Sequence, residues 1–198
     1  MMAGRTGDLE GADWLRLHHV AMAEFDVRVR LIPPDHWEAS TPCDEWDVHD
    51  LVRHNTVENL WVRPMLDGLS VADVGDAFDG DVLGSDPESV WEASRREALE
   101  AFDGADLDGE VALTRGATPT LEYLQERVFD LLVHAWDLAR GIGGDERLDD
   151  EVVQAVWDWA RPMAPMFADF PELFEPPVPV DPDDDLQTRL LHLTGRQV

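Results

Sequence analysis

The sequence predicts an all-α protein with four long helices, one shorter helix after them, and an extended Pro-rich tail. Apolar residues recur at helical spacing in five segments with recognisable ends, and residues 109–115 (GEVALTR) are the one candidate strand. The composition, 44% apolar and 29% charged over 198 residues, is that of a globular protein able to bury a core. We therefore expect a single domain over residues 1–198.

The first two helices have clear start and stop residues. The first is expected over about residues 9–31, where two consecutive prolines end it. In the second, Asp47 is the expected N-cap, and Asp50 three residues later makes a variant of the capping box. This helix should run to about residues 66–68, and Pro64 near its end should kink it or close it early.

The third and fourth helices carry a similar start pattern. Asp86 is the expected N-cap of the third, with Pro87 at the first helical position, where a missing N–H costs nothing. This helix should end near residues 102–104 (FDG). Residues 118–119 (Thr-Pro) repeat the pattern for the fourth helix, which should end at Gly141 with two further glycines close behind.

The remaining segments are a short helix and two irregular stretches. The fifth helix is expected over about residues 150–161, because Pro162 follows it. Residues 70–86 form a long loop rich in Asp and Gly, and residues 171–185 are Pro-rich and should be extended. We expect a helix in neither stretch.

The net charge limits the classes of partner. The 43 acidic residues outnumber 15 basic residues, all of them Arg, and the net charge is -28. Such a charge repels phosphate backbones and anionic lipids, so neither nucleic acid nor a membrane is an expected partner. The acidity has two explanations that the sequence leaves open, a salt-adapted host and a codon bias towards Arg.

The cysteine count and the apolar runs bear on the cellular location. Cys43 is the single cysteine, so no intrachain disulfide can form. No stretch approaches the roughly 20 apolar residues of a membrane-spanning helix, and the N-terminus lacks the apolar core of a signal peptide. We therefore expect a cytoplasmic protein, in which Cys43 has a packing role.

His54 on the second helix is predicted to point inward. At about 100° per residue, several apolar residues fall on its side of the helix: Leu51, Val57, Trp61 and Met65. Several polar residues fall outside this arc: Arg53, Asn55, Asn59 and Arg63. Asp50 and Glu58, four residues before and after His54, share its face. An inward histidine is either a hydrogen-bonded core residue or a metal ligand.

The fourth helix carries one narrow polar line on an otherwise apolar surface. The line consists of Tyr123, Arg127, Asp130, His134, Asp137 and Gly141. It could be the solvated face of the helix. However, Phe129, Val133 and Trp136 widen the apolar arc far beyond the one stripe that a surface helix needs, so we expect the helix to be largely enclosed. Enclosed polar groups need polar partners or a cavity.

Three of these residues have the composition of a metal site. Asp130 and His134 are four residues apart, so their side chains can bind one cation, and His54 on a neighbouring helix would be the third ligand. One carboxylate and two imidazoles are the ligands of open catalytic zinc or iron sites. Glu58 and Asp137 are reserve ligands, and Asp137 is expected rather to accept a hydrogen bond from an Arg or an imidazole.

Three ordered blocks of the sequence resemble one family. Residues 40–61 (STPCDEWDVHDLVRHNTVENLW) resemble the stretch around the first metal-binding histidine of the mycothiol-dependent maleylpyruvate isomerase family, part of the DinB-like metal-binding superfamily. Residues 130–143 (DLLVHAWDLARGIG) resemble its second motif block. Residues 176–196 (PPVPVDPDDDLQTRLLHLTGR) resemble the ending of a compact, mostly actinobacterial subgroup.

The resemblance implies a DinB-like four-helix bundle with a divalent metal, usually zinc, with nickel or iron as alternatives. Its ligands would be His54, Asp130 and His134. Asp130 stands where the isomerase has Glu, so this shorter side chain would bind directly or through water. The isomerase's C-terminal domain is not expected in this chain, so its particular reaction is not carried over.

The implied function is a thiol-dependent transfer or isomerisation on a small electrophilic molecule, with a low-molecular-weight thiol such as mycothiol. Trp61, Tyr123 and Arg127 are the candidates to contact the thiol or substrate, although each could instead serve the core or a surface ion pair. The alternative is a non-catalytic metal-binding bundle with a regulatory or dimerising role. A homodimer is possible under either hypothesis.

Overall fold

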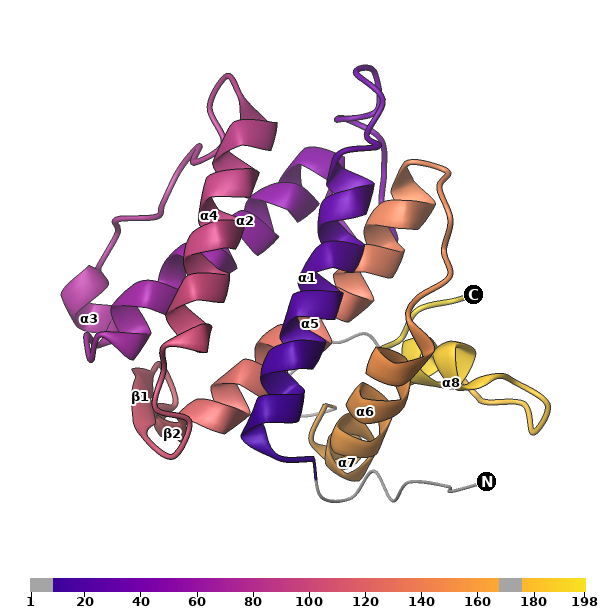
Figure 1. Cartoon of the computed structure of the whole chain (residues 1–198). Helices are drawn as coiled ribbons and strands as arrows, with labels where there is room; N and C mark the ends of the chain where they lie inside the picture. The colour runs from indigo at the N-terminus through magenta and orange to yellow at the C-terminus, as the bar shows by residue number, and fades with distance from the viewer. Residues whose placement is uncertain (1–8, 168–175) are drawn as a thin grey trace.

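Four long helices form the body of the molecule: α1 (Gly11–Val29), α2 (Val48–Leu66), α4 (Pro87–Asp103) and α5 (Thr120–Gly141). The computed structural model describes residues 9–167 and 176–198. The shorter elements are α3 (Val71–Val74), β1 (Glu110–Leu113), β2 (Gly116–Pro119), α6 (Asp150–Ala160), η2 (Arg161–Met163), α7 (Ala164–Phe167) and α8 (Leu186–Leu193). The predicted all-α bundle with four long helices is confirmed (Figure 1).

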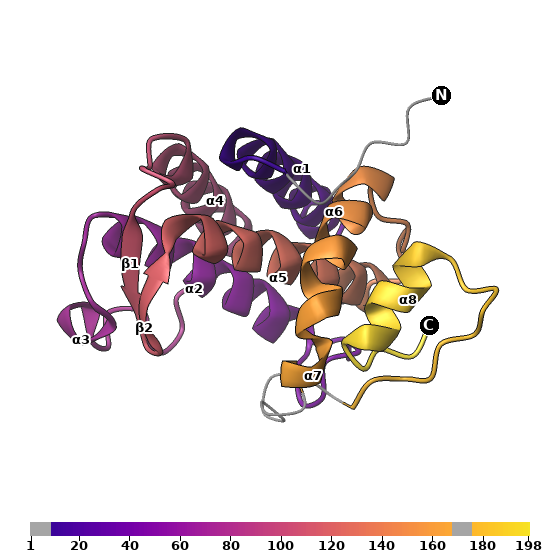
Figure 2. The ribbon, with the colours of Figure 1, turned by 90° about the horizontal axis from the view of Figure 1, so that it is seen from below.

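Helix α5 is the central element of the bundle. It packs most extensively against α1, while α2 packs most extensively against α4. Seen from below, α5 extends from the β1–β2 hairpin to α6 and α8 (Figure 2). This position explains why its surface is apolar on most sides.

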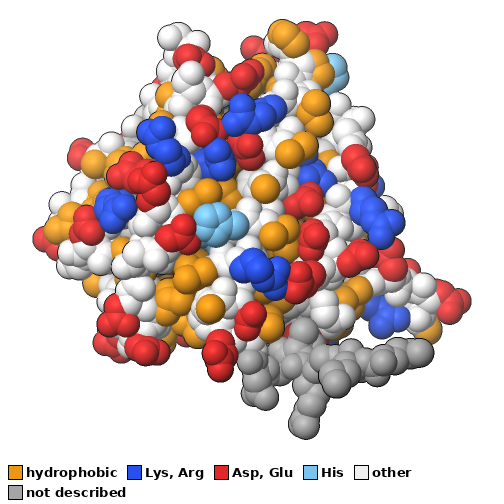
Figure 3. Space-filling view, in the orientation of Figure 1, with side chains coloured by type: hydrophobic (Ala, Val, Ile, Leu, Met, Phe, Trp, Pro, Cys, Tyr) orange, Lys and Arg blue, Asp and Glu red, His pale blue; other side chains and the backbone are white. Residues whose placement is uncertain are grey.

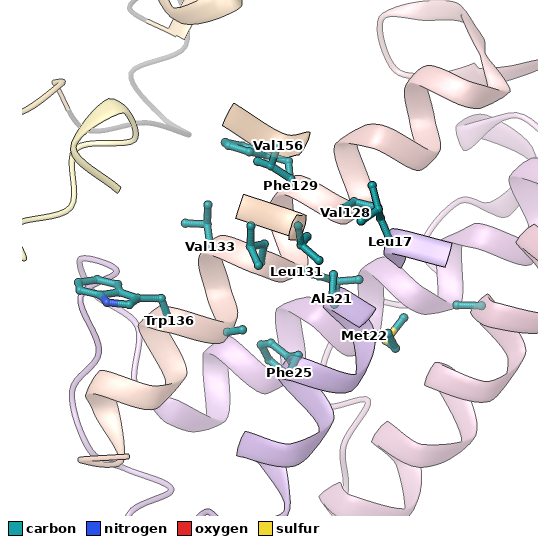
Figure 4. Packing of buried hydrophobic residues seen from close by; sticks show 14 of the residues in the cluster. Leu17, Ala21, Met22, Phe25, Val128, Phe129, Leu131, Val133, Trp136 and Val156 are labelled. Carbon is teal, nitrogen blue, oxygen red and sulfur yellow. The ribbon is translucent and has the colours of Figure 1, made fainter. Parts of the chain in front are cut away.

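The core is densest where α1 meets α5. Phe25 of α1 and Leu131 of α5 are fully buried and belong to the same apolar cluster (Figure 4). Val156 of α6 lies beside Phe129 on another side of α5. Each fully buried side chain of this size stabilises the fold by roughly 1.5–3 kcal/mol. The cluster therefore fixes the rotation of α5 about its axis, and with it the direction of the polar line.

The predicted helix starts of α2 and α4 are confirmed. The Asp47 carboxylate accepts a hydrogen bond from the Asp50 amide at 2.9 Å, and the Asp50 carboxylate accepts one from the Asp47 amide. At α4, Asp86 accepts from the Ser89 amide at 3.3 Å. Pro64 lies inside α2, which ends two residues later. The N-caps thus set where His54 lies along α2.

The fourth helix starts one residue later than predicted. Residues 118–119 belong to strand β2, where Thr118 pairs with Val111 and Pro119 pairs with Glu110 of β1. Helix α5 begins at Thr120, with Pro119 at the N-cap. Tertiary pairing with the candidate strand outweighs the local Thr-Pro pattern here, since that pattern also suits the end of an edge strand.

One further prediction needs correction, and one helix was not predicted. The loop over residues 70–86 does contain a helical turn, α3, because Ser70 and Asp73 form a reciprocal capping box. Residues 171–175 lie outside the described residues, whereas residues 176–185 contain no helix, as expected. Helix α8 was not predicted; Asp185 caps its start, and Leu190 and Leu191 bury its apolar face.

Acidic side chains are distributed over the visible face of the molecule, with Arg side chains among them (Figure 3). In the described part of the chain, no helix combines the length and apolar character that crossing a bilayer requires.

Candidate metal centre

The three predicted ligands meet at the contact between α2 and α5. Nε2 of His54 lies 3.3 Å from Oδ1 of Asp130, and Nε2 of His134 lies 3.3 Å from the same oxygen. The ligand atoms of all three residues lie within 4.8 Å of one another. Two imidazoles from different helices thus converge on one carboxylate oxygen.

The donor set and its spacing fit zinc. Zinc bonds of about 2.0–2.1 Å at tetrahedral angles hold neighbouring ligand atoms about 3.3–3.4 Å apart. The two 3.3 Å separations at Asp130 match this spacing. The side chains of His54 and Asp130 are each 27% exposed, so solvent reaches both. Three protein ligands with access from solvent are typical of catalytic rather than structural zinc sites.

Arg127 holds the second oxygen of Asp130. Its Nη1 donates to Oδ2 of Asp130 at 2.6 Å, and its Nη2 donates to Oδ1 of Asn59 at 3.4 Å. Glu58, a reserve ligand, lies 3.6 Å from the same Nη1 and so faces the guanidinium. Arg127 therefore leaves only Oδ1 of Asp130 facing the imidazoles.

The other ring nitrogen of His134 is also bound. Its Nδ1 lies 2.9 Å from Oδ2 of Asp137, a carboxylate with no exposed surface. The same oxygen accepts from Nη2 of Arg196 at 2.9 Å. Asp137 therefore lies behind His134, on the side away from Asp130, as a hydrogen-bond acceptor.

The pKa values of these groups follow from burial and from their neighbours. Burial alone would raise the pKa of Asp130, but His134, His54 and Arg127 hold that pKa well below its usual range. Burial alone would lower the pKa of His134, but Asp130 and then Asp137 raise it well above its usual value. Without a metal, a proton on His134 therefore balances the carboxylates. A divalent cation that displaces this proton would keep the charge compensated.

Trp46 covers the two imidazoles. Its ring centroid lies 4.9 Å from that of His54 and 5.9 Å from that of His134. The turn before it closes through a hydrogen bond from the Trp46 amide to the Cys43 carbonyl, with Glu45 in the left-handed region at φ 66°. An apolar ring beside the imidazoles lowers the local dielectric and strengthens electrostatic interactions there.

Gly141 allows α5 to approach this turn. A Cβ at Gly141 would lie 3.2 Å from Cγ2 of Val48 and 3.3 Å from Cγ2 of Thr41, closer than ordinary contact. The absence of a side chain there brings the end of α5 against the segment that carries Trp46.

Two of the three residues predicted to contact the thiol or substrate, Tyr123 and Arg127, are buried. Tyr123 is 5% exposed, and its ring packs at 5.5 Å from Phe102; Arg127 is 2% exposed and bound as above. That both contact a thiol or substrate stays a prediction, and their burial leaves little of either side chain accessible from solvent. Trp61 is half-buried, edge-on to Phe78 at 5.4 Å.

Comparisons with known proteins agree with this geometry. The family model of the mycothiol maleylpyruvate isomerase N-terminal domain matches residues 18–139, more than half of the chain. The chain belongs to this family. Two proteins of Mycobacterium tuberculosis, from strains CDC 1551 / Oshkosh and ATCC 25618 / H37Rv, are both named as uncharacterized. Each is 27% identical over 145 residues, which cover 71% of this chain and 73% of the relative.

Solved structures show the same fold. The crystal structure of the mycothiol-dependent maleylpyruvate isomerase has a TM-score of 0.61 at 15% identity and covers 77% of this chain and 70% of its own. A histidine-to-alanine variant of that enzyme gives 0.60 at 14% identity over the same shares of both chains. The fold is therefore the DinB-like bundle of the maleylpyruvate isomerase family, as predicted.

The residues matched by the isomerase-domain model include His54, Asp130 and His134, but not Arg196. Sequence reasoning missed Arg196 because it lies 59 positions from Asp137 and carries no periodic pattern. It missed Trp46 as well, although this residue lies within the first motif block. Trp46 lies eight positions before His54, outside the helix that carries His54. Helical periodicity therefore cannot predict on which side of His54 the Trp46 ring lies.

Asn55 and Asn59 fall outside the apolar arc predicted around His54, but they belong to the interior of the bundle. Both are buried, at 0% and 1% exposure. Nδ2 of Asn59 donates to Oγ of Ser94 at 3.4 Å, and its oxygen accepts from Arg127. Helix α2 packs against α4 and α5 together, so its buried arc is wider than the projection around His54 assumed.

Cys43 lies on the far side of His134 from Asp130. Its Sγ donates to Oδ2 of Asp137 at 3.3 Å and lies 3.8 Å from Nδ1 of His134. These three residues could also hold a cation, but Nη2 of Arg196 lies 3.6 Å from the sulfur and already compensates Asp137. The thiol is thus packed among polar groups, rather than in a purely apolar setting.

Proposed function

We propose that this protein binds a divalent metal, zinc being the expected ion, and uses it in a thiol-dependent transfer or isomerisation on a small electrophilic molecule. The thiol would be of the mycothiol type. Membership in the maleylpyruvate isomerase family supports the thiol-dependent class. The observation that carries the metal is the convergence of His54 and His134 on Oδ1 of Asp130.

Each nearby residue has a role in this proposal. His54, Asp130 and His134 would hold the ion, which when bound favours thiolate over thiol and so supplies a nucleophilic sulfur. Arg127 orients Asp130 by holding its second oxygen and neutralises its charge inside the bundle. Trp46 excludes water from the imidazole side of the site. Trp61, farther along α2, remains a candidate for contact with the thiol or substrate.

The openness of the site favours catalysis over the non-catalytic alternative. Structural zinc sites are closed by four protein ligands. Here three ligands are available, and the His54 and Asp130 side chains are each 27% exposed. A small thiol could therefore reach the ion. We expect the reaction to take place in the cytoplasm, and a homodimer is compatible with the proposal.

The test combines metal analysis with turnover. Purified protein should contain about one zinc per chain, and zinc-loaded protein should convert maleylpyruvate-like or other electrophilic substrates only when mycothiol is present. His54→Ala and His134→Ala should each lose the zinc and the activity. His19→Ala is the matched control, since His19 pairs with Asp103 on the α1–α4 side of the bundle and should retain both.

The outcomes separate the two functions. Metal without thiol binding would support the non-catalytic bundle. Protein that binds no divalent metal under any loading condition would refute both functions and leave an apo bundle whose site has decayed.

A further inference from the structure

Arg196, in the segment after α8, reaches into the wall of the metal centre. Its Nη2 lies 2.9 Å from Oδ2 of Asp137, and its Nε lies 3.3 Å from Oδ1 of the same carboxylate. Its remaining nitrogen, Nη1, donates to the carbonyl of Thr194 at 3.0 Å. The guanidinium thus binds both oxygens of Asp137 in the bidentate geometry that Arg forms with carboxylates.

Asp137 in turn fixes the ring of His134. Oδ2 of Asp137 lies 2.9 Å from Nδ1 of His134, while Nε2 of that ring faces Asp130 at 3.3 Å. An imidazole that keeps its proton on Nδ1 presents the lone pair of Nε2 to a metal. The orientation of Asp137 therefore selects which nitrogen is available as a ligand.

Asp137 cannot hold this position alone. It has no exposed surface, and a carboxylate buried without a cation is strongly destabilised. Arg196 is the guanidinium that compensates it, and its own side chain is 12% exposed. The segment after α8 thus completes a continuous chain of hydrogen bonds from Arg196 through Asp137 to His134.

We propose that Arg196 is a positioning residue for the metal centre. By holding Asp137, it keeps that carboxylate against Nδ1 of His134 and Nε2 turned towards Asp130, where the metal would bind. This inference rests on the proposed function, because it assigns Arg196 to the same metal site. It also gives the segment after α8 a part in a site built by α2 and α5.

Electrostatics alone predicts the opposite effect. Arg196 is a positive charge near a proposed cation site, so removing it should strengthen the binding of a divalent ion by Coulomb's law. If Arg196 positions His134, removing it should weaken binding. The sign of the change therefore separates positioning from simple charge.

The experiment compares Arg196→Gln and Arg196→Lys with wild type and with Arg189→Gln. Arg189 is the matched control, because it lies in the adjoining helix α8 and donates to the carbonyl of Pro182 instead of to Asp137. Zinc affinity is measured by competition with a chromophoric chelator. We expect Arg196→Gln to bind zinc roughly 10–100-fold more weakly, the range found when outer-shell partners of metal ligands are lost. Arg196→Lys should recover part of this loss, and Arg189→Gln should match wild type.

The visible absorption of bound cobalt(II) reports the ligands of the metal, and a general loss of stability would not change it. The visible absorption of the cobalt-loaded protein should change in Arg196→Gln in intensity or position, since one histidine no longer binds as before. The melting temperature of each metal-free variant shows whether it is folded at the assay temperature.

A double variant tests whether Arg196 acts through Asp137. In an Asp137→Asn background, which itself should bind zinc more weakly than wild type, adding Arg196→Gln should leave the zinc affinity unchanged. This background also removes the buried charge that could unfold Arg196→Gln, so the comparison is available even if the single variant does not fold.

Three results would overturn the inference. Zinc binding by Arg196→Gln that equals or exceeds wild type would refute positioning, while the proposed function would stand on wild-type zinc and thiol activity. Additive losses in the Asp137→Asn background would refute the route through Asp137. Wild-type protein that binds no metal would refute the proposed function, and this inference with it.

Discussion

His18 is a buried histidine in the contact between α1 and α4. It is 1% exposed, its ring lies 5.0 Å from that of Phe102, and its Nε2 has no hydrogen-bond partner among the described residues. Burial, and then the positive charge of Arg127, lower its pKa to about 3. The folded protein thus holds His18 neutral well below the pH at which an exposed histidine gains a proton.

This pKa makes the stability depend on pH. The folded-state pKa is depressed, so below the unfolded value of about 6.5 the unfolded chain binds the extra proton and folding is disfavoured. We expect His18 to cost about 1.4 kcal/mol of unfolding free energy per pH unit as the pH falls from about 6 towards 3. Urea unfolding of wild type and His18→Leu at pH 7, 6 and 5 checks this. The unfolding free energy of the leucine variant should rise relative to that of wild type by this amount for each pH unit below about 6.

Phe102→Leu is the control for the His18 comparison. It disturbs the same contact but removes no titrating group, so its difference from wild type should be independent of pH. A constant difference between wild type and His18→Leu over this range would contradict the assigned pKa.

For single residues, the sequence predicted those positions that depend on spacing within one helix. The four-residue interval from Asp130 to His134 placed both on one face of α5, and the helical projection around His54 pointed it inward as the third ligand. The bonds of Arg127 to Asp130 and Asn59 were not predicted, because the partner on another helix depends on how α2 and α5 rotate against each other. That rotation is fixed by core packing, not by local sequence.

At the element scale, helix ends were predictable where a side chain bonds its own backbone. Asp47 and Asp86 cap their helices as expected. The start of α5 was not predictable in this way, because residues 118–119 bond to β1. Helix α8 was missed since it has only 8 residues, too short to form without packing partners.

The N-cap of α2 gives a test at this scale. Asp47→Ala removes the acceptor for the Asp50 amide and should cost about 1 kcal/mol of stability. In a protein of this size, that corresponds to a fall of about 2–4 °C in the melting temperature. Thermal unfolding monitored by circular dichroism measures it.

Asp44→Ala serves as the control for the cap. Asp44 is an exposed acid three residues earlier that caps no helix, so its removal should change the melting temperature little. Equal effects of the two substitutions would indicate that lost negative charge, and not lost capping, causes the change.

At the scale of the whole molecule, the net charge of -28 opposes folding by self-repulsion. Raising NaCl from 0.1 to 1 M shortens the screening length from about 10 Å to about 3 Å. We therefore expect the midpoint of urea unfolding to rise with salt. Asp76→Asn/Asp79→Asn, which removes two exposed charges with no ion pair among the described residues, should raise the midpoint at low salt and reduce its salt dependence. A midpoint that falls with salt would show that ion pairs dominate.

A metal bound at the proposed site would link that site to the stability of the whole bundle. His54 and Asp130 lie on different helices, so an ion bound by both exists only when α2 and α5 are packed together, and it stabilises the folded state alone. Free zinc at about 100 times its Kd should add about 2.7 kcal/mol. For a chain of this length, that raises the melting temperature by about 5–10 °C. Differential scanning calorimetry with zinc and then with excess chelator should show this shift and its reversal.

His54→Ala and His134→Ala should melt at the same temperature in both conditions, whereas His19→Ala should keep the full shift. A zinc-dependent rise that persists in both ligand variants would place the ion elsewhere in the molecule.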